Sequence, residues 1–125
     1  MIVIDTSIWI EFFKNNTEYR TTVKNLLEEQ KILAVECIFG ELLQGAKNKR
    51  EKDILFSYWE NLPKCEREDI WIKAGIFSSE NKLISKGIGL IDCVILLSAK
   101  NSNAKIWSLD KKVNSILKKD EKFTL

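Results

Sequence analysis

The chain has 125 residues and a mass of 14.5 kDa, which is the size of one ordinary domain. Hydrophobic residues make up 45% and charged residues 30% of the sequence, a balance that excludes disordered, collagen-like and low-complexity chains. The formal net charge is only +2, which excludes a polybasic nucleic-acid arm but leaves room for a local basic patch. We expect a single folded domain over residues 1–125.

The absence of histidine limits the chemistry that the chain can perform. It excludes Ser-His-Asp triads, Cys-His pairs and histidine-ligated zinc, so catalysis by the protein must use carboxylates, hydroxyls, Lys, Arg, Tyr or Cys. Cys37, Cys65 and Cys93 are an odd number of cysteines and form no Cys-x-x-Cys motif. This pattern argues against a disulfide scaffold and a thiolate zinc site, and we expect three small buried apolar groups.

The first residues contain no recognisable targeting signal. They lack a basic region followed by a long apolar stretch, as a signal peptide would require. No run of the sequence is apolar for long enough to span a bilayer. We therefore expect a cytoplasmic protein without a membrane segment.

The first half of the chain alternates short apolar runs with amphipathic stretches. Residues 2–4 and 32–35 are apolar runs rich in β-branched side chains, typical of strands buried on both faces. Residues 47–52 form a charged junction, and Pro63 closes the stretch that follows it. The spacing of apolar residues predicts helices over residues 8–13, 38–46 and 54–62. A further helix is predicted after the polar stretch 14–18 and ends at about residue 30.

The second half continues the alternation. Residues 69–86 predict a long helix that ends at Gly87. Residues 92–97 begin with an aspartate and are otherwise apolar on every side, which predicts a buried helix. Residues 105–109 predict a strand, and residues 113–117 a final helix. Because strands alternate with helices and no linker divides them, the sequence predicts one three-layer α/β domain around a parallel sheet.

Two carboxylates follow predicted strands directly. Asp5 comes after residues 2–4 and is followed by Thr6 and Ser7. Asp110 comes after residues 105–109, and Ser108 precedes it by two positions. In an open parallel sheet, ligands bind at the carboxyl ends of the strands. We therefore expect these acids and hydroxyls to lie at one edge of the sheet.

Two further carboxylates lie within otherwise apolar predicted helices. A charge at Glu41 or Asp92 is costly there unless something offsets it. Taken singly, Asp5 and Asp92 could be helix N-caps, Glu41 could face water, and Asp110 could be a turn residue. Taken together in a protein without histidine, they favour a site for hard divalent cations such as Mg²⁺ or Mn²⁺.

The same residues carry a family resemblance. The motifs Ile-Val-Ile-Asp5-Thr-Ser, Glu41-Leu-Leu-Gln-Gly, Gly-Leu-Ile-Asp92 and Ser-Leu-Asp110 resemble those of the PIN-domain family, in its order and at similar spacing. Among its members, the chain most resembles the compact VapC-type ribonuclease toxins of bacterial toxin–antitoxin pairs. The resemblance runs from Met1 to about Leu117, so it covers nearly the whole sequence.

The resemblance implies a metal-dependent endoribonuclease. Asp5, Glu41, Asp92 and Asp110 would bind one or two Mg²⁺ or Mn²⁺ ions as the catalytic group, and a metal-bound water would attack the RNA phosphodiester. The metal ligands or the phosphate would be supported by the hydroxyl residues Thr6, Ser7 and Ser108.

The resemblance also implies a fold and partners. The fold would be a PIN-like α/β/α domain with a central parallel sheet of about four to five short strands. The partners would be the RNA substrate, a cognate VapB-like antitoxin protein and a second copy in a homodimer. The chain departs from many relatives at Lys112, where they carry a second aspartate, and at Val113, where they carry an aromatic residue. It also has Glu36 where they commonly have a small hydroxyl residue, either as added negative charge or as a helix cap.

Basic and aromatic residues flank the carboxylates. The basic side chains could hold an RNA backbone around the acids, or they could simply cover solvated helix faces. Trp59 and Trp71 are expected in the core, whereas Trp9, Phe12 and Phe13 could offer apolar surface to a partner. The candidate RNA-binding residues are Lys47, Lys49, Arg50, Lys86, Lys111 and Lys112.

Two other functions remain to be weighed against a ribonuclease. A PIN-like domain that has lost its metal could bind RNA or protein without catalysis, although the intact set of four carboxylates argues against this. A receiver-like or phosphatase domain could use Asp5 as a phosphoacceptor. Thr6 and Ser7 follow Asp5 where a dehalogenase-type nucleophile would have a second aspartate two residues later, so that pattern is not met.

Overall fold

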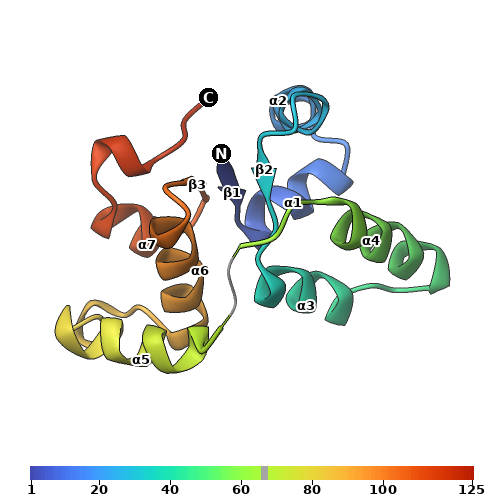
Figure 1. Cartoon of the computed structure of the whole chain (residues 1–125). Coiled ribbons are helices and arrows are strands. Elements are labelled where there is room, and N and C mark those ends of the chain that lie inside the picture. Colours follow the sequence, from blue (N-terminus) through green and yellow to red (C-terminus); the bar gives the residue numbers. More distant parts are fainter. Residues whose placement is uncertain (66–67) are drawn as a thin grey trace.

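A short parallel sheet lies at the centre of the protein (Figure 1). The structure is a computed structural model that describes residues 1–65 and 68–125. The strand order is β2-β1-β3, and β1 pairs in parallel with both neighbours. The strands are β1 (Ile2–Ile4), β2 (Ile32–Leu33) and β3 (Lys105–Trp107).

The sheet is smaller than the expected four to five strands. The described residues form three strands, and isolated bridges join Ala34 to Lys64 and Ile106 to Lys122. The strand predicted over 32–35 stops early because Val35 already caps the next helix. The α/β architecture with a parallel sheet is confirmed.

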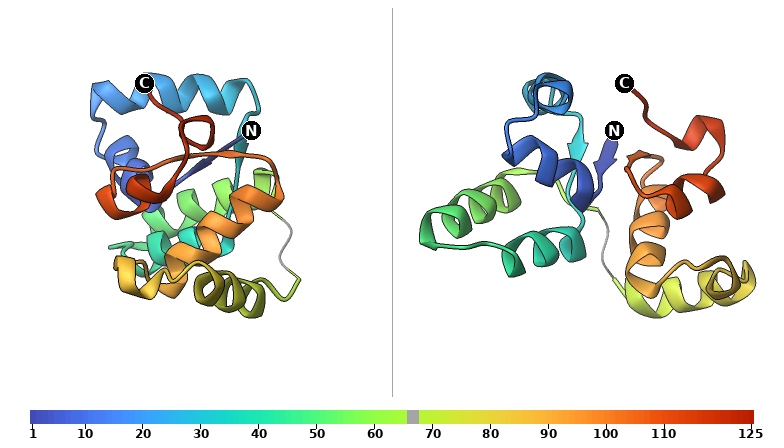
Figure 2. Two further views of the ribbon diagram at one scale, coloured as in Figure 1. Left: turned by 90° about the vertical axis from the view of Figure 1, so that its left-hand side faces the viewer. Right: turned by 180° about the vertical axis from the view of Figure 1, so that it is seen from behind.

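Helices flank this sheet on two sides (Figures 1 and 2). One side carries α1 (Thr6–Phe13), α2 (Thr17–Glu28), α3 (Glu36–Gln44) and α4 (Lys49–Asn61). The other side carries α5 (Ile70–Glu80), α6 (Leu90–Asn101) and α7 (Lys111–Ile116), with short 3₁₀ turns η1 (Ile84–Lys86) and η2 (Lys119–Glu121). Helix α3 packs against both α1 and α6, which brings the two halves of the chain together.

The core surrounds the central strand. All three residues of β1 are buried, and α1 places Ile8 and Trp9 against them. The predicted buried helix is α6, whose residues 93–96 are all buried. Because β1 is held from both faces, the residue at its carboxyl end has a fixed position.

The prediction of one long helix over residues 69–86 is wrong. Helix α5 ends at Glu80, and Lys82 has a left-handed backbone with φ of 53°. This conformation interrupts the helix and turns Leu83 into the core. The turn η1 follows, and Gly87 ends it with φ of 76°, a conformation that glycine adopts without strain.

The prediction for the tryptophans is partly wrong. Trp59 is half-buried against the core, but Trp71 is 48% exposed. Helix α5 turns Ile70 and Ala74 inward, and Trp71 lies off that line. Trp9 is fully buried, so it cannot form partner surface as the sequence allowed.

The cysteines are all free thiols. Cys65 and Cys93 are buried as expected, and Cys37 is half-buried. No helix in residues 1–65 or 68–125 is both long and apolar enough to cross a membrane.

Candidate active site

Asp5 lies at the carboxyl end of the central strand and caps α1. Its Oδ1 accepts the backbone N–H of Thr6 at 2.7 Å, and its Oδ2 accepts the hydroxyl of Ser108 at 2.6 Å. Its own N–H donates to the carbonyl of Trp107 on β3 at 3.0 Å. Only 9% of Asp5 is exposed, and two hydrogen bonds hold its carboxylate in place. The structure thus combines the N-cap and strand-end interpretations of this residue.

Asp110 is tied to the same hydroxyl. It caps α7, and its Oδ1 accepts the backbone N–H of Lys112 at 2.8 Å. Its own N–H donates to Ser108 Oγ at 3.0 Å. The Ser7 hydroxyl completes the junction by accepting the N–H of Leu109 at 3.1 Å. The ends of β1 and β3 are therefore joined through serine side chains.

Glu41 reaches the site from α3. Its Oε1 accepts the Thr6 hydroxyl at 3.0 Å, which links α3 to the first turn of α1. Glu41 is exposed rather than buried among apolar residues, so the expectation that its charge needs an offset within an apolar helix is wrong. The neighbouring Phe39 and Leu42 face the core instead.

Asp92 completes the group from the first turn of α6. The N-cap of this helix is Gly89, so the N-cap interpretation of Asp92 is wrong. Partial burial raises the pKa of Asp92, and the negative charges of Asp110, Asp5 and Glu41 raise it further. A backbone hydrogen bond at Gly89 opposes this shift. The other three carboxylates therefore lie close enough to Asp92 to act on it electrostatically.

Cys37 is a neighbour of the site that sequence reasoning missed. Burial raises the pKa of its thiol to about 12, and the charges of Glu41 and Asp5 add to this shift. The signal was present, because Cys37 precedes Glu41 by one helical turn. At neutral pH the group is a thiol, so it adds no further negative charge.

The donor chemistry fits a hard divalent cation. Carboxylate and hydroxyl oxygens are the ligands that Mg²⁺ and Mn²⁺ prefer. Within the described residues, however, no three acidic or thiol side chains form a ready-made cage for an ion. Mg²⁺ keeps several waters and commonly uses only one or two carboxylates together with substrate phosphates, so it needs no such cage.

The predicted basic residues fall into different surroundings. Lys47 and Arg50 line the same groove as Glu41. Lys49 instead pairs with Asp53 at 2.9 Å on the exposed side of α4. The side chain of Lys112 lies over Gly87. Of the remaining two, Lys86 lines a hollow between α5, α6 and the C-terminal segment 116–121, and Lys111 is exposed at the start of α7.

A groove of about 580 Å³ adjoins the carboxylates, and we call it the acid-edge groove. Its lining combines the polar Thr6 and Glu41 and the basic Arg50 with the apolar side chains of Ile10, Phe13 and Ile54. It is bounded by α1, α3 and α4. A lining that mixes apolar and charged side chains suits an amphipathic partner segment.

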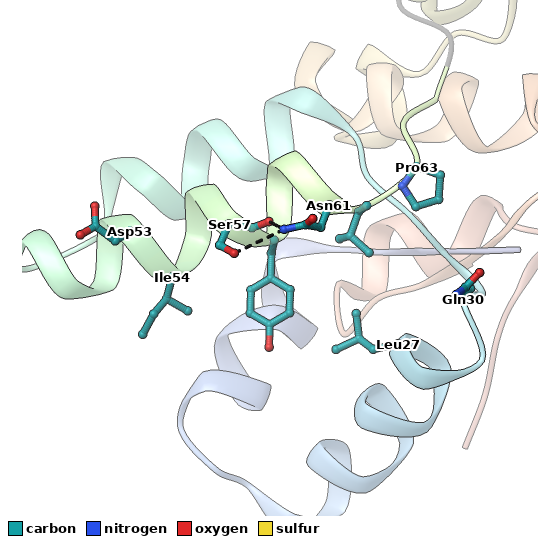
Figure 3. A pocket seen from close by; sticks show the side chains of 9 residues that line it. Leu27, Gln30, Asp53, Ile54, Ser57, Asn61 and Pro63 are labelled. Atoms are coloured by element: carbon teal, nitrogen blue, oxygen red, sulfur yellow. Dashed lines mark hydrogen bonds between the residues drawn. The ribbon is translucent and has the colours of Figure 1, made fainter.

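A second hollow of about 760 Å³ lies between α2 and α4, and we call it the α2–α4 groove (Figure 3). Leu27 and Gln30 line one side, and Ser57 and Asn61 line the other. Ile54 belongs to both grooves, so the two hollows meet at this side chain. The α2–α4 groove contains none of the four site carboxylates.

Comparisons with known proteins identify relatives of this chain. The sequence profile of the PIN domain matches residues 2–119. VapC ribonuclease Mb1587 of Mycobacterium bovis is 29% identical over 116 residues, which cover 88% of this chain and 87% of that protein. Ribonuclease VapC11 of Mycobacterium tuberculosis matches with the same identity and coverage.

Solved structures share the fold. A toxin–antitoxin complex from Klebsiella pneumoniae superposes with a TM-score of 0.73 at 17% identity, over 93% of this chain and 92% of that one. VapBC2 from Rickettsia felis, bound to a DNA fragment from their promoter, superposes with a TM-score of 0.70 at 22% identity, over 93% of each chain.

Proposed function

We propose that this chain, which belongs to the PIN-domain family, is the toxin of a toxin–antitoxin pair and cleaves RNA with the help of Mg²⁺ or Mn²⁺. The observation that carries the proposal is the meeting of four carboxylates at the carboxyl edge of the sheet. Hydrogen bonds through Ser108 and Thr6 hold three of them there, and all three raise the pKa of Asp92. The relatives named VapC ribonuclease support the reaction type.

The four carboxylates would hold the metal, which when bound supplies an activated water and neutralises charge on the phosphate. Asp5 and Asp110 would be the most rigid ligands, because each caps a helix and both contact Ser108. Asp92 and Glu41 would approach from α6 and α3. Thr6 would orient Glu41, and Ser7 would hold the Leu109 backbone beside Asp110.

The RNA backbone would pass beside the carboxylates. Lys47 and Arg50 adjoin Glu41 and are free to contact phosphates, whereas Lys49 is already paired with Asp53. Basic side chains next to an acidic site let the protein attract RNA while the metal neutralises the acids. Since RNA is the substrate, we place this activity in the cytoplasm.

A cognate antitoxin would cover the same surface. The acid-edge groove and the α2–α4 groove meet at Ile54, so together they could hold an extended or helical partner segment. A basic side chain of the partner could then neutralise the carboxylates. The Klebsiella and Rickettsia structures, in which related folds occur with antitoxins, support such a partner. We also propose a homodimer as the form of the toxin.

A cleavage assay on total RNA tests the proposed reaction. The purified chain is incubated with RNA in EDTA, in Mg²⁺ and in Mn²⁺, beside an Asp5→Asn variant prepared in parallel. We expect cleavage only by the wild type and only with metal. Absence of cleavage under all conditions would favour a non-catalytic RNA- or protein-binding PIN domain, and equal cleavage in EDTA would exclude the metal mechanism.

A further inference from the structure

The C-terminal third of the chain carries an excess of positive charge. Residues 82–122 contain nine lysines and four acidic residues, a net charge of +5, whereas the whole chain has only +2. The ion pairs formed by the described residues lie in the first half of the chain, so none of these lysines has a carboxylate partner among them. An unpaired excess of one charge attracts partners of the opposite charge.

Three of these lysines line one hollow, which we call the lysine hollow. It has a volume of about 240 Å³ and lies between α5, α6 and the C-terminal segment, on one side of the sheet (Figure 1). Lys86, Lys100 and Lys118 line it together with apolar side chains that include Phe77. The ammonium group of Lys100 lies 5.6 Å from the centre of the Phe77 ring, which holds it beside this aromatic surface. Glu121 also lines the hollow, but its carboxylate accepts the backbone N–H of Lys118 at 2.8 Å and so belongs to the turn η2.

A fourth lysine connects the lysine hollow to the candidate active site. Lys112 follows Asp110 by two residues and donates its backbone N–H to that carboxylate. A Cβ placed on Gly87 would lie 3.4 Å from the ammonium nitrogen of Lys112, so this side chain packs against the bare glycine backbone. Gly87 directly follows Lys86, which lines the hollow. The cations of Lys112 and Lys86 therefore lie between Asp110 and the lysine hollow.

The distance along α6 matches a short stretch of RNA. Asp92 belongs to the candidate site and Lys100 to the lysine hollow, and they lie eight residues or about 12 Å apart along the helix axis. A strand with stacked bases advances roughly 3.4 Å per nucleotide, so this distance corresponds to about three or four nucleotides. Lysines bind the phosphates of such a strand, and apolar or aromatic side chains such as Phe77 bind its bases.

We propose that the lysine hollow is a second RNA-binding surface, which holds the substrate strand about three or four nucleotides away from the cleaved phosphate. The proposal rests on the proposed ribonuclease function and adds a substrate class to it, namely RNA that continues past the cleavage site along α6. The acid-edge groove and the α2–α4 groove share no lining residue with the lysine hollow. A partner segment in those grooves therefore leaves this surface to the RNA.

Binding of a single-stranded RNA of about 24 nucleotides, measured by fluorescence anisotropy in EDTA, tests the proposal. The double variant Lys100→Gln/Lys118→Gln should bind this RNA about tenfold more weakly than the wild type. The slope of log affinity against log salt should fall in magnitude by about 1.4, because each lost phosphate contact removes about 0.7. Lys24→Gln/Lys105→Gln is the matched control, since it removes two exposed lysines that line neither the hollow nor the two grooves.

Two further measurements separate RNA binding from a structural role. Both double variants should melt like the wild type, because the four substituted side chains are exposed and form no ion pair within the described residues. In the cleavage assay, Lys100→Gln/Lys118→Gln should raise the KM of a long RNA about tenfold and leave kcat unchanged, since neither lysine contacts the cleaved phosphate. A substrate trimmed to about two nucleotides on each side of the cleavage site is too short to reach the hollow, so wild type and variant should cleave it equally.

Three binding results would overturn the proposal. These are a wild type that does not bind the long RNA, a Lys100→Gln/Lys118→Gln variant that binds it like the wild type, and a control variant that loses as much affinity. If Lys100→Gln/Lys118→Gln binds RNA normally but the antitoxin more weakly, the hollow takes an acidic protein segment instead. Because binding is measured without metal, these results do not depend on cleavage, and the ribonuclease proposal stands or falls on its own assay.

Discussion

Ser108 donates a 2.6 Å hydrogen bond from its Oγ to Oδ2 of Asp5, across 103 residues of sequence. The same oxygen accepts the backbone N–H of Asp110 at 3.0 Å. Ser108 is buried, so water cannot readily replace these contacts. One hydroxyl thus sets the position of one carboxylate relative to another at adjacent strand ends.

Ser108→Ala should reduce RNA cleavage by about 10- to 100-fold, the usual cost of losing a residue that orients a metal ligand. The Mg²⁺ concentration that gives half of the maximal cleavage rate should rise, because the variant binds the metal less tightly. Stability should fall by about 1 kcal/mol, the net value of one hydrogen bond. Ser115→Ala is the control, since Ser115 is exposed and its hydroxyl donates to the nearby Lys112 carbonyl, away from Asp5. Equal activity of both variants would remove Ser108 from the site.

Asp92→Asn should melt at a higher temperature than the wild type in EDTA at neutral pH. The pKa of Asp92 is raised in the folded state, first by burial and then by the other carboxylates. A raised pKa costs stability above the folded value, and this cost disappears below the unfolded value of about 4. The difference between the two proteins should therefore vanish as the pH falls to about 4, which melting curves against pH would measure.

Mg²⁺ should narrow that difference by stabilising the wild type. With a dissociation constant on the order of 1 mM, ~10 mM Mg²⁺ contributes about 1.4 kcal/mol, or roughly 3–6 °C in melting temperature. The Asp92→Asn protein should respond less, because it lacks one ligand. A wild type that melts above Asp92→Asn in EDTA, with neither protein responding to Mg²⁺, would contradict a shared acidic site.

Lys47→Ala and Arg50→Ala should weaken RNA binding and lower its salt dependence. Each lost phosphate contact reduces the slope of log affinity against log salt by about 0.7 for single-stranded RNA. Lys49→Ala should have a smaller effect, because Lys49 already pairs with Asp53. Titrations at several salt concentrations, with Lys24→Ala on α2 as the control, measure this. Identical slopes for all four variants would show that no RNA backbone runs along the acid-edge groove.

Ile54→Ser should weaken binding of the cognate antitoxin by at least about 30-fold, since Ile54 lies where the two grooves meet. RNA cleavage by the free toxin should remain near the wild-type rate. Phe56→Ser is the control, because Phe56 is on the same helix, is more exposed and lines neither groove. Equal antitoxin affinity of the two variants, measured by calorimetry, would place the antitoxin elsewhere.

The sequence predicted the parts of this structure that depend on local rules. Asp5 and Asp110 each follow a strand and precede a helix, so their places at the sheet edge could be inferred from short stretches of chain. The Lys49–Asp53 pair could also have been found from its spacing of four residues. The hydrogen bond from Thr6 to Glu41 could not, because it depends on how α3 packs against α1.

Helix α5 shows why burial was harder to predict. It has apolar residues on both sides, with Ile70 and Ala74 facing α6 and with Trp71, Ile72 and Ile76 facing away. Periodicity finds an apolar face but cannot choose between two such faces. The break after Glu80 was missed for a related reason, since Lys82 adopts a left-handed conformation that its residue type does not announce.

The most direct test of the proposed metal centre is a calorimetric titration of the protein with Mn²⁺. The wild type should bind Mn²⁺, and Asp5→Asn, Glu41→Gln, Asp92→Asn and Asp110→Asn should each bind it at least about tenfold more weakly, because each loses a charged oxygen ligand. Glu36→Gln should bind it like the wild type, since Glu36 lines a different hollow, among α3, α5 and α6. Unchanged Mn²⁺ affinity in all four site variants would contradict a metal site formed by these carboxylates.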